Sequence, residues 1–227
     1  MTVKTTRIRW TCHRLVPSRF PPTSLYDRVA DPADLDIIFA IENLTNPRVR
    51  DEVGALQLVP ADDRVSGEGT TPIMAAFTHL NPAGSRFTDG SWGVYYAGES
   101  VETAIAETMY HRARFLAATS EPAMEIDMRH YLANLSASLH DVRGKQAELP
   151  GLYDPVDYSV AQRFARTLRT DNSWGIVYDS VRRPEGQCVA VFRPRALSNC
   201  RQSQHIAFVW DGSKMSGWYS KSAITPV

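Results

Sequence analysis

The chain has 227 residues, 43% of them hydrophobic and 22% charged, which is close to the average of globular proteins. Lys and Arg number 25 and Asp and Glu also number 25, so the formal net charge is zero, which argues against a surface built mainly to bind nucleic acid. No stretch approaches the roughly 20 apolar residues of a membrane span, and the start MTVKTTRIRWTC lacks the apolar core of a secretory signal.

No Ser/Gly-rich or charge-rich linker divides the chain, so we expect a single domain over residues 1–227 with neither a nucleic-acid nor a membrane partner. The three cysteines, Cys12, Cys188 and Cys200, are odd in number and none of them has CxxC spacing. This pattern predicts reduced thiols in a cytoplasmic protein.

The first third of the chain gives the weakest structural signals. Residues 1–34 are rich in proline and arginine and are predicted to form irregular structure that wraps a core. The segment LDIIFAIENLT, residues 35–45, predicts a helix. ALQLV, residues 55–59, predicts a short strand, whereas IMAAFTHL, residues 73–80, fits a helix or a strand equally well.

A strand followed by an amphipathic helix is predicted in the middle of the chain. GVYYAG, residues 93–98, is the strand, and Ser100 suits the N-cap of the helix, with Glu102 in its first turn. Apolar or small side chains then recur at helical spacing as far as about Phe115: Val101, Ala104, Ile105, Thr108 and Met109. Glu107 lies at the edge of this face, where a carboxylate can point into a cleft beside the sheet.

The last part of the chain is rich in strand patterns. AMEIDM, residues 123–128, predicts a strand, and residues 140–157 read as a loop. A helix is predicted from Tyr158, with Val160, Phe164 and Leu168 on one side, and further strands are predicted at WGIVYDS, GQCVAVF and HIAFVWD. Strands outnumber helices and come partly in succession, so the predicted fold class is α+β.

Side chains suited to one chemistry lie on two short segments. Arg86 lies in a turn between Gly84 and Gly90, and an arginine fork matches phosphate oxygens. Tyr96 supplies a flat apolar ring with a polar hydroxyl at its tip. Because side chains alternate along a strand, Tyr96 and its neighbour Tyr95 are expected on opposite faces of the sheet.

Two further residues complete the candidate set. A carboxylate at Glu107 can stabilise an oxocarbenium-like transition state, and Ser180 ends a later strand. Any one of these residues alone is more commonly a surface or turn residue, but as a set they suit the binding of a dinucleotide and the cleavage of its glycosidic bond. Arg19, held between prolines in VPSRFPP, is a weaker candidate for a second phosphate contact.

Other chemistries have less support from the sequence. No histidine pair has HxxxH spacing, so a metal site has no local support. There is no GxSxG elbow, no GxxxxGK[ST] phosphate loop and no GxGxxG fingerprint. A Cys12–His13 dyad is disfavoured because adjacency in sequence does not bring two side chains together.

The combined pattern resembles the RES-domain toxins, a family named for arginine, glutamate and serine, whose members pair with Xre-like antitoxins in bacterial toxin–antitoxin modules. The matching residues are Arg86, the stretch from Tyr96 to Glu107, and Ser180 in YDSVRRPEG. The match covers residues 84–195 as a signature core. The chain departs from the family in having Gly-Ser-Arg-Phe where many members have Gly-Gly-Arg-Trp. Residues 1–80 are expected to be an N-terminal extension packed on the core. This portion is longer than in the compact members of the family, and in this the chain resembles the longer ParT-type toxins of ParS/ParT modules.

The resemblance implies an ADP-ribosyltransferase-like fold of mixed sheets with flanking helices, which consumes NAD+ as substrate without a metal. ParT-like members transfer ADP-ribose to a protein, whereas others use water or phosphate as acceptor. Two alternatives therefore stay open: a glycohydrolase or phosphorylase that depletes NAD+, and a non-catalytic module that binds a nucleotide or a partner. An Xre/ParS-like antitoxin that occludes the active site is the expected partner.

Each residue has an expected role in NAD+ cleavage. Nicotinamide leaves as a neutral molecule, so the site must supply positioning and charge stabilisation rather than an acid. Arg86 is expected to hold the pyrophosphate, and Tyr96 to pack on nicotinamide or its ribose. Glu107 is expected to bind the ribose hydroxyl and stabilise the cation, and Ser180 to fix the nicotinamide side or a phosphate.

Overall fold

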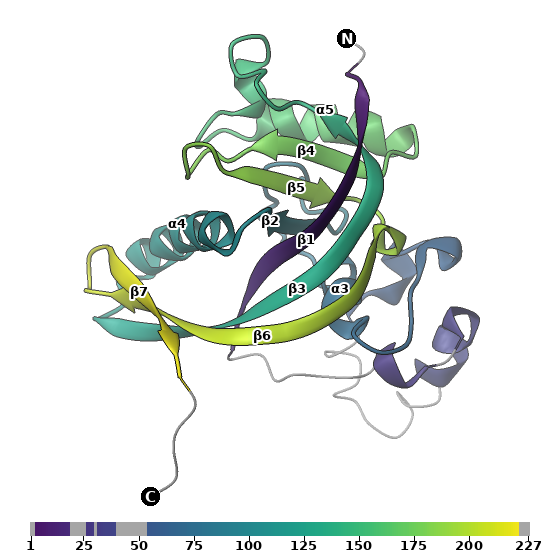
Figure 1. Cartoon of the computed structure of the whole chain (residues 1–227), viewed down its shortest axis with the longest axis horizontal. Coiled ribbons are helices and arrows are strands. Elements are labelled where there is room, and N and C mark those ends of the chain that lie inside the picture. The colour runs from purple at the N-terminus through teal and green to yellow at the C-terminus, as the bar shows by residue number, and fades with distance from the viewer. Residues whose placement is uncertain (1–2, 19–25, 30, 40–53, 223–227) are drawn as a thin grey trace, which may run out of the picture.

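The computed structural model describes residues 3–18, 26–29, 31–39 and 54–222, and its centre is a seven-stranded mixed sheet (Figure 1). The strands are β1 Thr5–Pro17, β2 Tyr95–Gly98, β3 Met124–Asp141, β4 Gly175–Asp179, β5 Gln187–Val191, β6 Leu197–Trp210 and β7 Met215–Lys221. The longer helices are α3 Thr71–Thr78, α4 Val101–Thr119 and α5 Ser159–Thr170. Short 3-10 helices lie at Tyr26–Arg28, Pro32–Asp34, Leu56–Leu58, Ala61–Asp63, Pro150–Leu152 and Pro194–Ala196.

The strand order is β1-β2-β5-β4-β3-β6-β7, with an additional pairing of β1 with β3. The pairings of β1, β2, β5, β4 and β3 therefore form a closed circuit, from which β6 and β7 extend on one side. Only the β3–β4 pairing is parallel, and it is short. Figure 1 shows the long strands β1, β3 and β6 curving together, with β4 and β5 beneath α5 and with α4 to one side of the sheet.

The prediction of irregular structure over residues 1–34 is wrong for the part that forms β1. This strand pairs with β3 over its whole length, from Thr5 opposite His140 to Pro17 opposite Met128. From Thr6 to Cys12 every second side chain is buried or partly buried, with Ile8 and Cys12 in the core, because one face of the strand is covered.

Other predictions in the first third have mixed outcomes. ALQLV is not a strand, since Leu56–Leu58 forms a 3-10 helix. The ambiguous segment over residues 73–80 is helical as far as Thr78, where α3 ends. Residues 35–39 are helical as predicted, and the rest of the predicted 35–45 helix lies outside the described residues.

Most later predictions are confirmed, with changes of length. The strand predicted over residues 123–128 continues to Asp141 as β3, into the segment read as a loop, and β7 was not predicted at all. Helix α5 lies where it was predicted, but its buried face is formed by Ala161, Ala165 and Leu168 rather than by Val160, whose exposed fraction is 42%.

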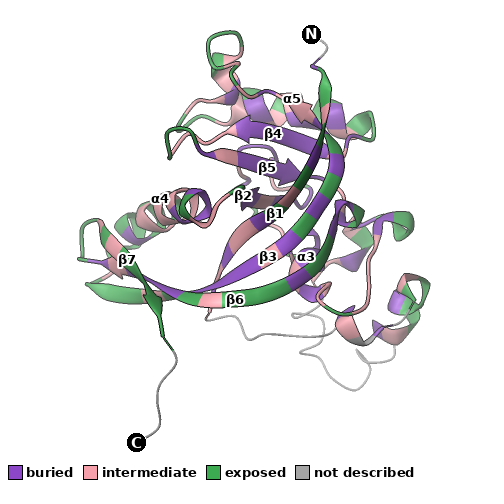
Figure 2. Ribbon diagram, in the orientation of Figure 1, coloured by how far each residue is buried: buried purple, intermediate pink, exposed green. Residues whose placement is uncertain are grey.

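Each helix packs on a different part of the sheet, which divides the core into clusters. Helix α5 lies on the most deeply buried strands, β4 and β5, as the purple ribbon in Figure 2 shows. Helix α4 places Ala104 and Ile105 against Leu15 of β1 and Phe208 of β6. Helix α3 joins the largest cluster, with β1 and β3. This packing leaves the edge of α4 that carries Glu107 facing the ends of β4 and β5.

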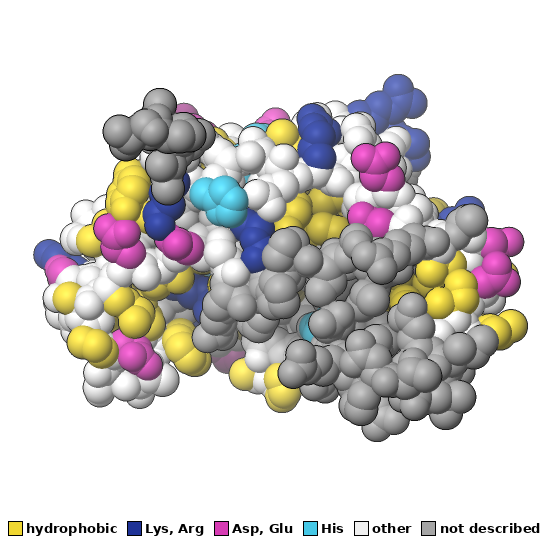
Figure 3. Space-filling view, turned by 90° about the horizontal axis from the view of Figure 1, so that it is seen from below, with side chains coloured by type: hydrophobic (Ala, Val, Ile, Leu, Met, Phe, Trp, Pro, Cys, Tyr) yellow, Lys and Arg dark blue, Asp and Glu magenta, His cyan; other side chains and the backbone are white. Residues whose placement is uncertain are grey.

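These findings confirm the α+β class. Cys12, Cys188 and Cys200 are buried free thiols. No helix among the described residues is long and apolar enough to cross a membrane. On the face drawn in Figure 3, charged side chains of both signs are interspersed with hydrophobic ones, in keeping with the zero net charge.

Candidate active site

Arg86 is presented by a compact turn that its own backbone makes rigid. Gly84 has φ +69°, and a Cβ atom there would approach the carbonyl oxygen of Thr88 to 2.6 Å. Ser85 and Thr88 form a backbone bridge across the turn. This glycine is therefore required by the turn itself, because no other residue fits a left-handed conformation with so close a contact.

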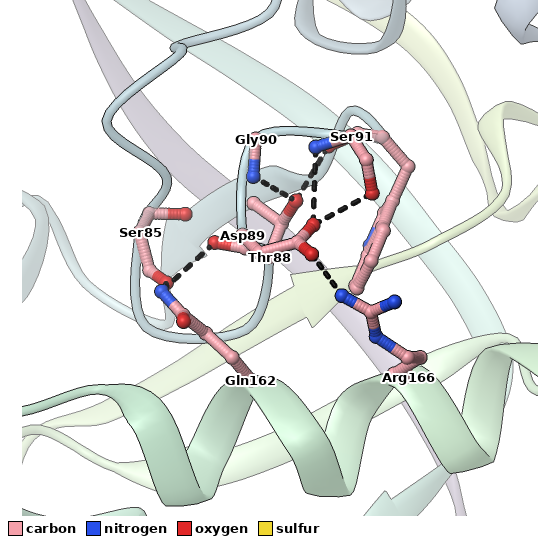
Figure 4. Close-up of polar contacts among 8 residues, drawn as sticks. Ser85, Thr88, Asp89, Gly90, Ser91, Gln162 and Arg166 are labelled. Atoms are coloured by element: carbon pink, nitrogen blue, oxygen red, sulfur yellow. Dashed lines mark hydrogen bonds and ion pairs between the residues drawn. The ribbon is translucent and has the colours of Figure 1, made fainter.

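Helix α5 fixes the same turn from outside, as the close-up in Figure 4 shows. The Gln162 Nε2 amide donates to the carbonyl oxygens of Ser85 at 3.0 Å and Thr88 at 3.2 Å. Arg166 forms an ion pair with Asp89, whose carboxylate also accepts hydrogen bonds from Ser91. The turn is thus attached to a packed helix, which positions Arg86 before any ligand arrives.

The Arg86 side chain is buried, with an exposed fraction of 7%. Its Nη1 donates to the carbonyl oxygens of Leu152 at 2.8 Å and Asp154 at 2.9 Å. The guanidinium carbon lies 4.7 Å from the centre of the Tyr158 ring. Arg86 therefore ties the turn to residues 152–158, and only its remaining N–H groups are left for a ligand.

Tyr96 supports the arginine turn through its hydroxyl. The hydroxyl accepts a hydrogen bond from the Phe87 backbone N–H at 2.9 Å and lies 2.8 Å from the Ser85 hydroxyl. Burial raises the pKa of Tyr96 to about 12, although the hydrogen bonds from Ser85 and Phe87 oppose the shift. Tyr95, on the opposite face of β2, is fully buried in the largest core cluster, which confirms the predicted alternation.

Glu107 and Ser180 meet directly, although 73 positions separate them in the sequence. The Ser180 hydroxyl donates to Glu107 Oε1 at 2.6 Å. The same oxygen of Ser180 accepts hydrogen bonds from the backbone N–H groups of Arg182 at 3.1 Å and Arg183 at 3.0 Å. Because the lone pairs of the serine oxygen accept these two backbone N–H groups, the hydroxyl hydrogen is directed at the Glu107 carboxylate.

The backbone explains why the two residues meet. Ser100 caps α4, accepting a hydrogen bond from the Thr103 N–H at 3.2 Å, as predicted. Gly186, in the connection between β4 and β5, lies so close to that first turn that a Cβ atom would approach Thr103 Oγ1 to 2.7 Å. The absence of a side chain at this glycine lets the connection pack on α4 and brings Ser180 to Glu107.

Arg86 and Glu107 belong to the same electrostatic environment. Burial raises the pKa of the Cys188 thiol, the negative charge of Glu107 raises it further, and the positive charge of Arg86 opposes the shift. The Tyr178 hydroxyl responds in the same directions to the same groups. The charges of Arg86 and Glu107 therefore both act on the pKa values of Cys188 and Tyr178, as expected if the arginine and the carboxylate belong to one site.

Sequence reasoning missed Arg182, which lies two positions after Ser180. Its guanidinium carbon lies 3.3 Å from the centre of the Tyr110 ring, and its side chain donates to the Pro155 carbonyl oxygen. Its Nε is buried and has no hydrogen-bond partner in the described part of the chain. The available signal was the Arg-Arg pair that follows the serine in YDSVRRPEG.

Arg19, the weaker phosphate candidate, lies outside the described residues. The structure brings Ser180 and Glu107 into contact, places Tyr96 against the arginine turn, and joins Arg86 to them through shared electrostatics. The described residues hold no group of three or more His, Cys, Asp or Glu side chains that suits a metal ion.

Fold and site together define an α+β protein with a buried arginine and a serine-bound carboxylate whose charges act on the same neighbouring side chains, Tyr178 and Cys188. A family model described as the RES domain matches residues 63–211, which include Arg86, Tyr96, Glu107 and Ser180. The chain belongs to the RES domain family.

Two individual proteins are similar to this chain. "Uncharacterized protein y4oC" of Sinorhizobium fredii (strain NBRC 101917 / NGR234) is 32% identical over 209 residues, which cover 92% of this chain and 86% of that protein. A chain in the crystal structure of the M. tuberculosis MbcT–MbcA toxin–antitoxin complex has 12% identity and a TM-score of 0.48, and the match covers 92% of this chain and 88% of that chain.

Proposed function

We propose that this protein is the toxin of a bacterial toxin–antitoxin module, acting in the cytoplasm to cleave the nicotinamide–ribose bond of NAD+ and transfer ADP-ribose to an acceptor. The observation that carries the proposal is the 2.6 Å hydrogen bond from Ser180 to Glu107, a carboxylate whose charge acts on Cys188 and Tyr178 together with that of the buried Arg86. Membership of the RES family and a mixed sheet with helices around it fit the ADP-ribosyltransferase-like fold that the family resemblance implies.

Cleavage breaks the bond between ribose C1′ and the pyridinium nitrogen, and the bonding electron pair goes to that nitrogen. The leaving nicotinamide is neutral and needs no proton, whereas positive charge develops on the ribose. The Glu107 carboxylate stabilises that charge, because a preorganised negative group opposes it most strongly in the transition state. The acceptor then forms a bond to C1′ and releases its proton to Glu107 or to water.

Ser180 orients the carboxylate in this mechanism. The Ser180 hydroxyl donates its hydrogen bond to Glu107 Oε1, while Oε2 accepts no hydrogen bond within the described part of the chain. Oε2 is therefore the oxygen we assign to a ribose hydroxyl. The N–H groups of Arg86 not used by Leu152 and Asp154 are assigned to the anionic part of the substrate, and the Tyr96 ring to the nicotinamide side.

The test is release of nicotinamide from NAD+ by the purified protein, followed by chromatography. Glu107→Gln keeps the shape of the side chain and removes its charge, so we expect the rate to fall on the order of 100-fold or more. Glu68→Gln, at an exposed glutamate outside the site, is the matched control and should retain full turnover. Near-normal turnover by the Glu107 variant would remove that residue from the mechanism, and no turnover by any form would favour a non-catalytic binding module.

The acceptor is identified with labelled NAD+ and bacterial lysate. We favour a protein acceptor, because residues 1–80 add a portion that compact family members lack. Label on a protein band supports this assignment. Label recovered only in ADP-ribose or its phosphate identifies a glycohydrolase or a phosphorylase instead.

We further propose that an Xre/ParS-like antitoxin inhibits the protein by covering the site. A carboxylate-bearing segment of such a partner suits the N–H groups of Arg86. NAD+ and antitoxin then exclude each other, so added antitoxin should raise the apparent KM or abolish turnover. An antitoxin complex with undiminished turnover contradicts this model.

A further inference from the structure

His111 lies on α4 four positions after Glu107, about one turn further along the helix. Side chains four positions apart in a helix lie on the same face, with about 5–6 Å between their Cβ atoms. The negative charge of Glu107 acts on the pKa of His111. The charges of three arginines act on it as well: Arg182, Arg114 and Arg86. His111 therefore belongs to the surroundings of the candidate carboxylate, although the mechanism proposed above gives it no role.

The His111 imidazole is positioned by a neighbouring aromatic ring. The Tyr110 ring meets it edge-on, with 5.4 Å between the ring centres and 78° between the ring planes. Tyr110 is itself held at two points, because its hydroxyl donates to the Pro155 carbonyl oxygen at 3.2 Å and the guanidinium of Arg182 stacks on its ring. His111 is exposed, and neither of its ring nitrogens makes a hydrogen bond to another described residue. An incoming molecule can therefore reach an imidazole nitrogen whose lone pair is unused.

The surroundings of His111 favour the neutral imidazole. Desolvation by the surrounding protein lowers the pKa of His111 below its ordinary value of 6.5. The negative charge of Glu107 opposes this shift, whereas the positive charges of the three arginines add to it. A neutral imidazole has one nitrogen that can accept a proton, which the guanidinium groups nearby cannot do.

Formation of the new bond to ribose C1′ calls for such a proton acceptor. In the proposed mechanism Glu107 is already occupied, because Oε1 accepts the Ser180 hydroxyl and Oε2 is assigned to a ribose hydroxyl. We propose that His111 is the general base of the transfer step and takes the proton of a neutral acceptor: a hydroxyl, a thiol, an amine or water.

The step balances as follows in atoms and electrons. A lone pair of the acceptor atom forms the bond to C1′. The bond from that atom to hydrogen breaks, its electrons stay on the acceptor, and its proton passes to an imidazole nitrogen of His111. The imidazolium later releases the proton to water. This inference rests on the proposed function, and it narrows the acceptor to a nucleophile that still carries its proton, as opposed to an anion such as phosphate.

Azide tests the role of His111, because azide attacks as an anion and brings no proton to remove. Wild type, His111→Gln and the control His205→Gln, at an exposed histidine of β6, are each incubated with labelled NAD+ and lysate, with and without azide. Label transferred to protein or water and label in ADP-ribosyl azide are both quantified. We expect His111→Gln to slow transfer to protein or water about 100-fold, and to form the azide product at the wild-type rate. His205→Gln should match the wild type in both products, and circular dichroism checks the fold of each variant.

The pH dependence gives a second measurement. The ratio of transfer product to azide product, at pH values where azide stays an anion, cancels every step that the two reactions share. For the wild type this ratio should fall as the pH drops through the pKa of His111, because a protonated imidazole accepts no proton, and His111→Gln should lack this fall. Arg114→Gln removes an exposed positive charge that lowers the pKa of His111, so the fall should begin at a higher pH.

Three outcomes overturn the proposal: unchanged transfer by His111→Gln, equal losses of transfer and azide product in that variant, or transfer to phosphate alone by the wild type. If the wild type forms neither product, the proposed function itself fails and this inference fails with it. The two failures are therefore distinguishable, because the wild type remains active in one and is inactive in the other.

Discussion

Ser180 Oγ and Glu107 Oε1 lie 2.6 Å apart, and the serine oxygen also accepts two backbone hydrogen bonds. In the proposed mechanism the serine is a positioning residue, because it binds one oxygen of the carboxylate and leaves the other for substrate. Its effect on the reaction should pass through Glu107 rather than act alone.

We predict that Ser180→Ala lowers kcat for nicotinamide release by on the order of tenfold, less than Glu107→Gln does. The double variant should be no slower than Glu107→Gln alone, because the serine has nothing left to orient. Rates of all three variants under saturating NAD+ provide the measurement. Multiplicative losses would show that the serine acts independently of Glu107.

The adjacent tyrosines of β2 provide a matched pair of substitutions. Tyr96→Phe removes the acceptor of the Phe87 N–H, so the free energy of unfolding should fall by about 1–2 kcal/mol and the KM for NAD+ should rise. Tyr95→Phe removes a buried hydroxyl whose side-chain hydrogen bond is to the Cys200 thiol, a weak hydrogen-bonding group, so it should cost less stability than Tyr96→Phe. Urea unfolding of both variants checks the contrast, and equal losses would contradict it.

Arg86→Lys keeps the positive charge and loses the planar fork. A lysine cannot hold the Leu152 and Asp154 carbonyls and also present a two-point contact to a phosphate. We therefore expect the KM for NAD+ to rise about tenfold, with the protein still folded. Arg163→Lys on the exposed face of α5 is the control. If the KM stayed the same and only the melting temperature fell, Arg86 would be a structural residue of the turn.

Stability should fall as the medium becomes acidic because of a stacked histidine pair. His13 Nδ1 and His130 Nε2 lie 2.9 Å apart, and burial, followed by the charge of His13, lowers the pKa of His130 to about 4. The unfolded chain takes up its proton near the ordinary pKa of 6.5, so stability is lost between about pH 6.5 and pH 4.

Urea unfolding across that pH window measures this loss. His130→Gln should flatten the dependence of the unfolding free energy on pH, whereas His205→Gln, at an exposed histidine, should leave the slope unchanged. Parallel slopes for the wild type and His130→Gln would contradict the assignment.

The sequence predicted correctly those elements that depend on interactions between residues close together in the chain. Helix α4 and its Ser100 cap follow from residues within a few positions of one another, and both are confirmed. Strand β1 was missed because its partner in the sheet lies far along the chain, although Ile8 and Cys12 show part of the alternation. Likewise, Leu135, Ala137 and Leu139 alternate with polar residues through the unpredicted half of β3.

The site shows the same division. Arg86, Glu107 and Ser180 were predicted as a set from their residue types and family spacing, but the contact of Ser180 with Glu107 depends on how the β4–β5 connection packs on α4. The pairing of the Tyr96 hydroxyl with the arginine turn depends on a backbone N–H, which carries no sequence signal. The stacking of Arg182 on Tyr110 joins two segments whose proximity only the fold establishes.

The full-length pairing of β1 with β3 affects how the protein is made on the ribosome. Residues 5–17 leave the ribosome well before their partner, residues 128–140, is synthesised. Contacts between segments so distant in sequence slow folding and leave the early strand exposed in the meantime. The α4 region lies between the two strands in the sequence, so the protein cannot complete its sheet until the segment carrying Glu107 has emerged. A nascent chain that stops before β3 therefore lacks the partner of β1 and cannot assemble the site.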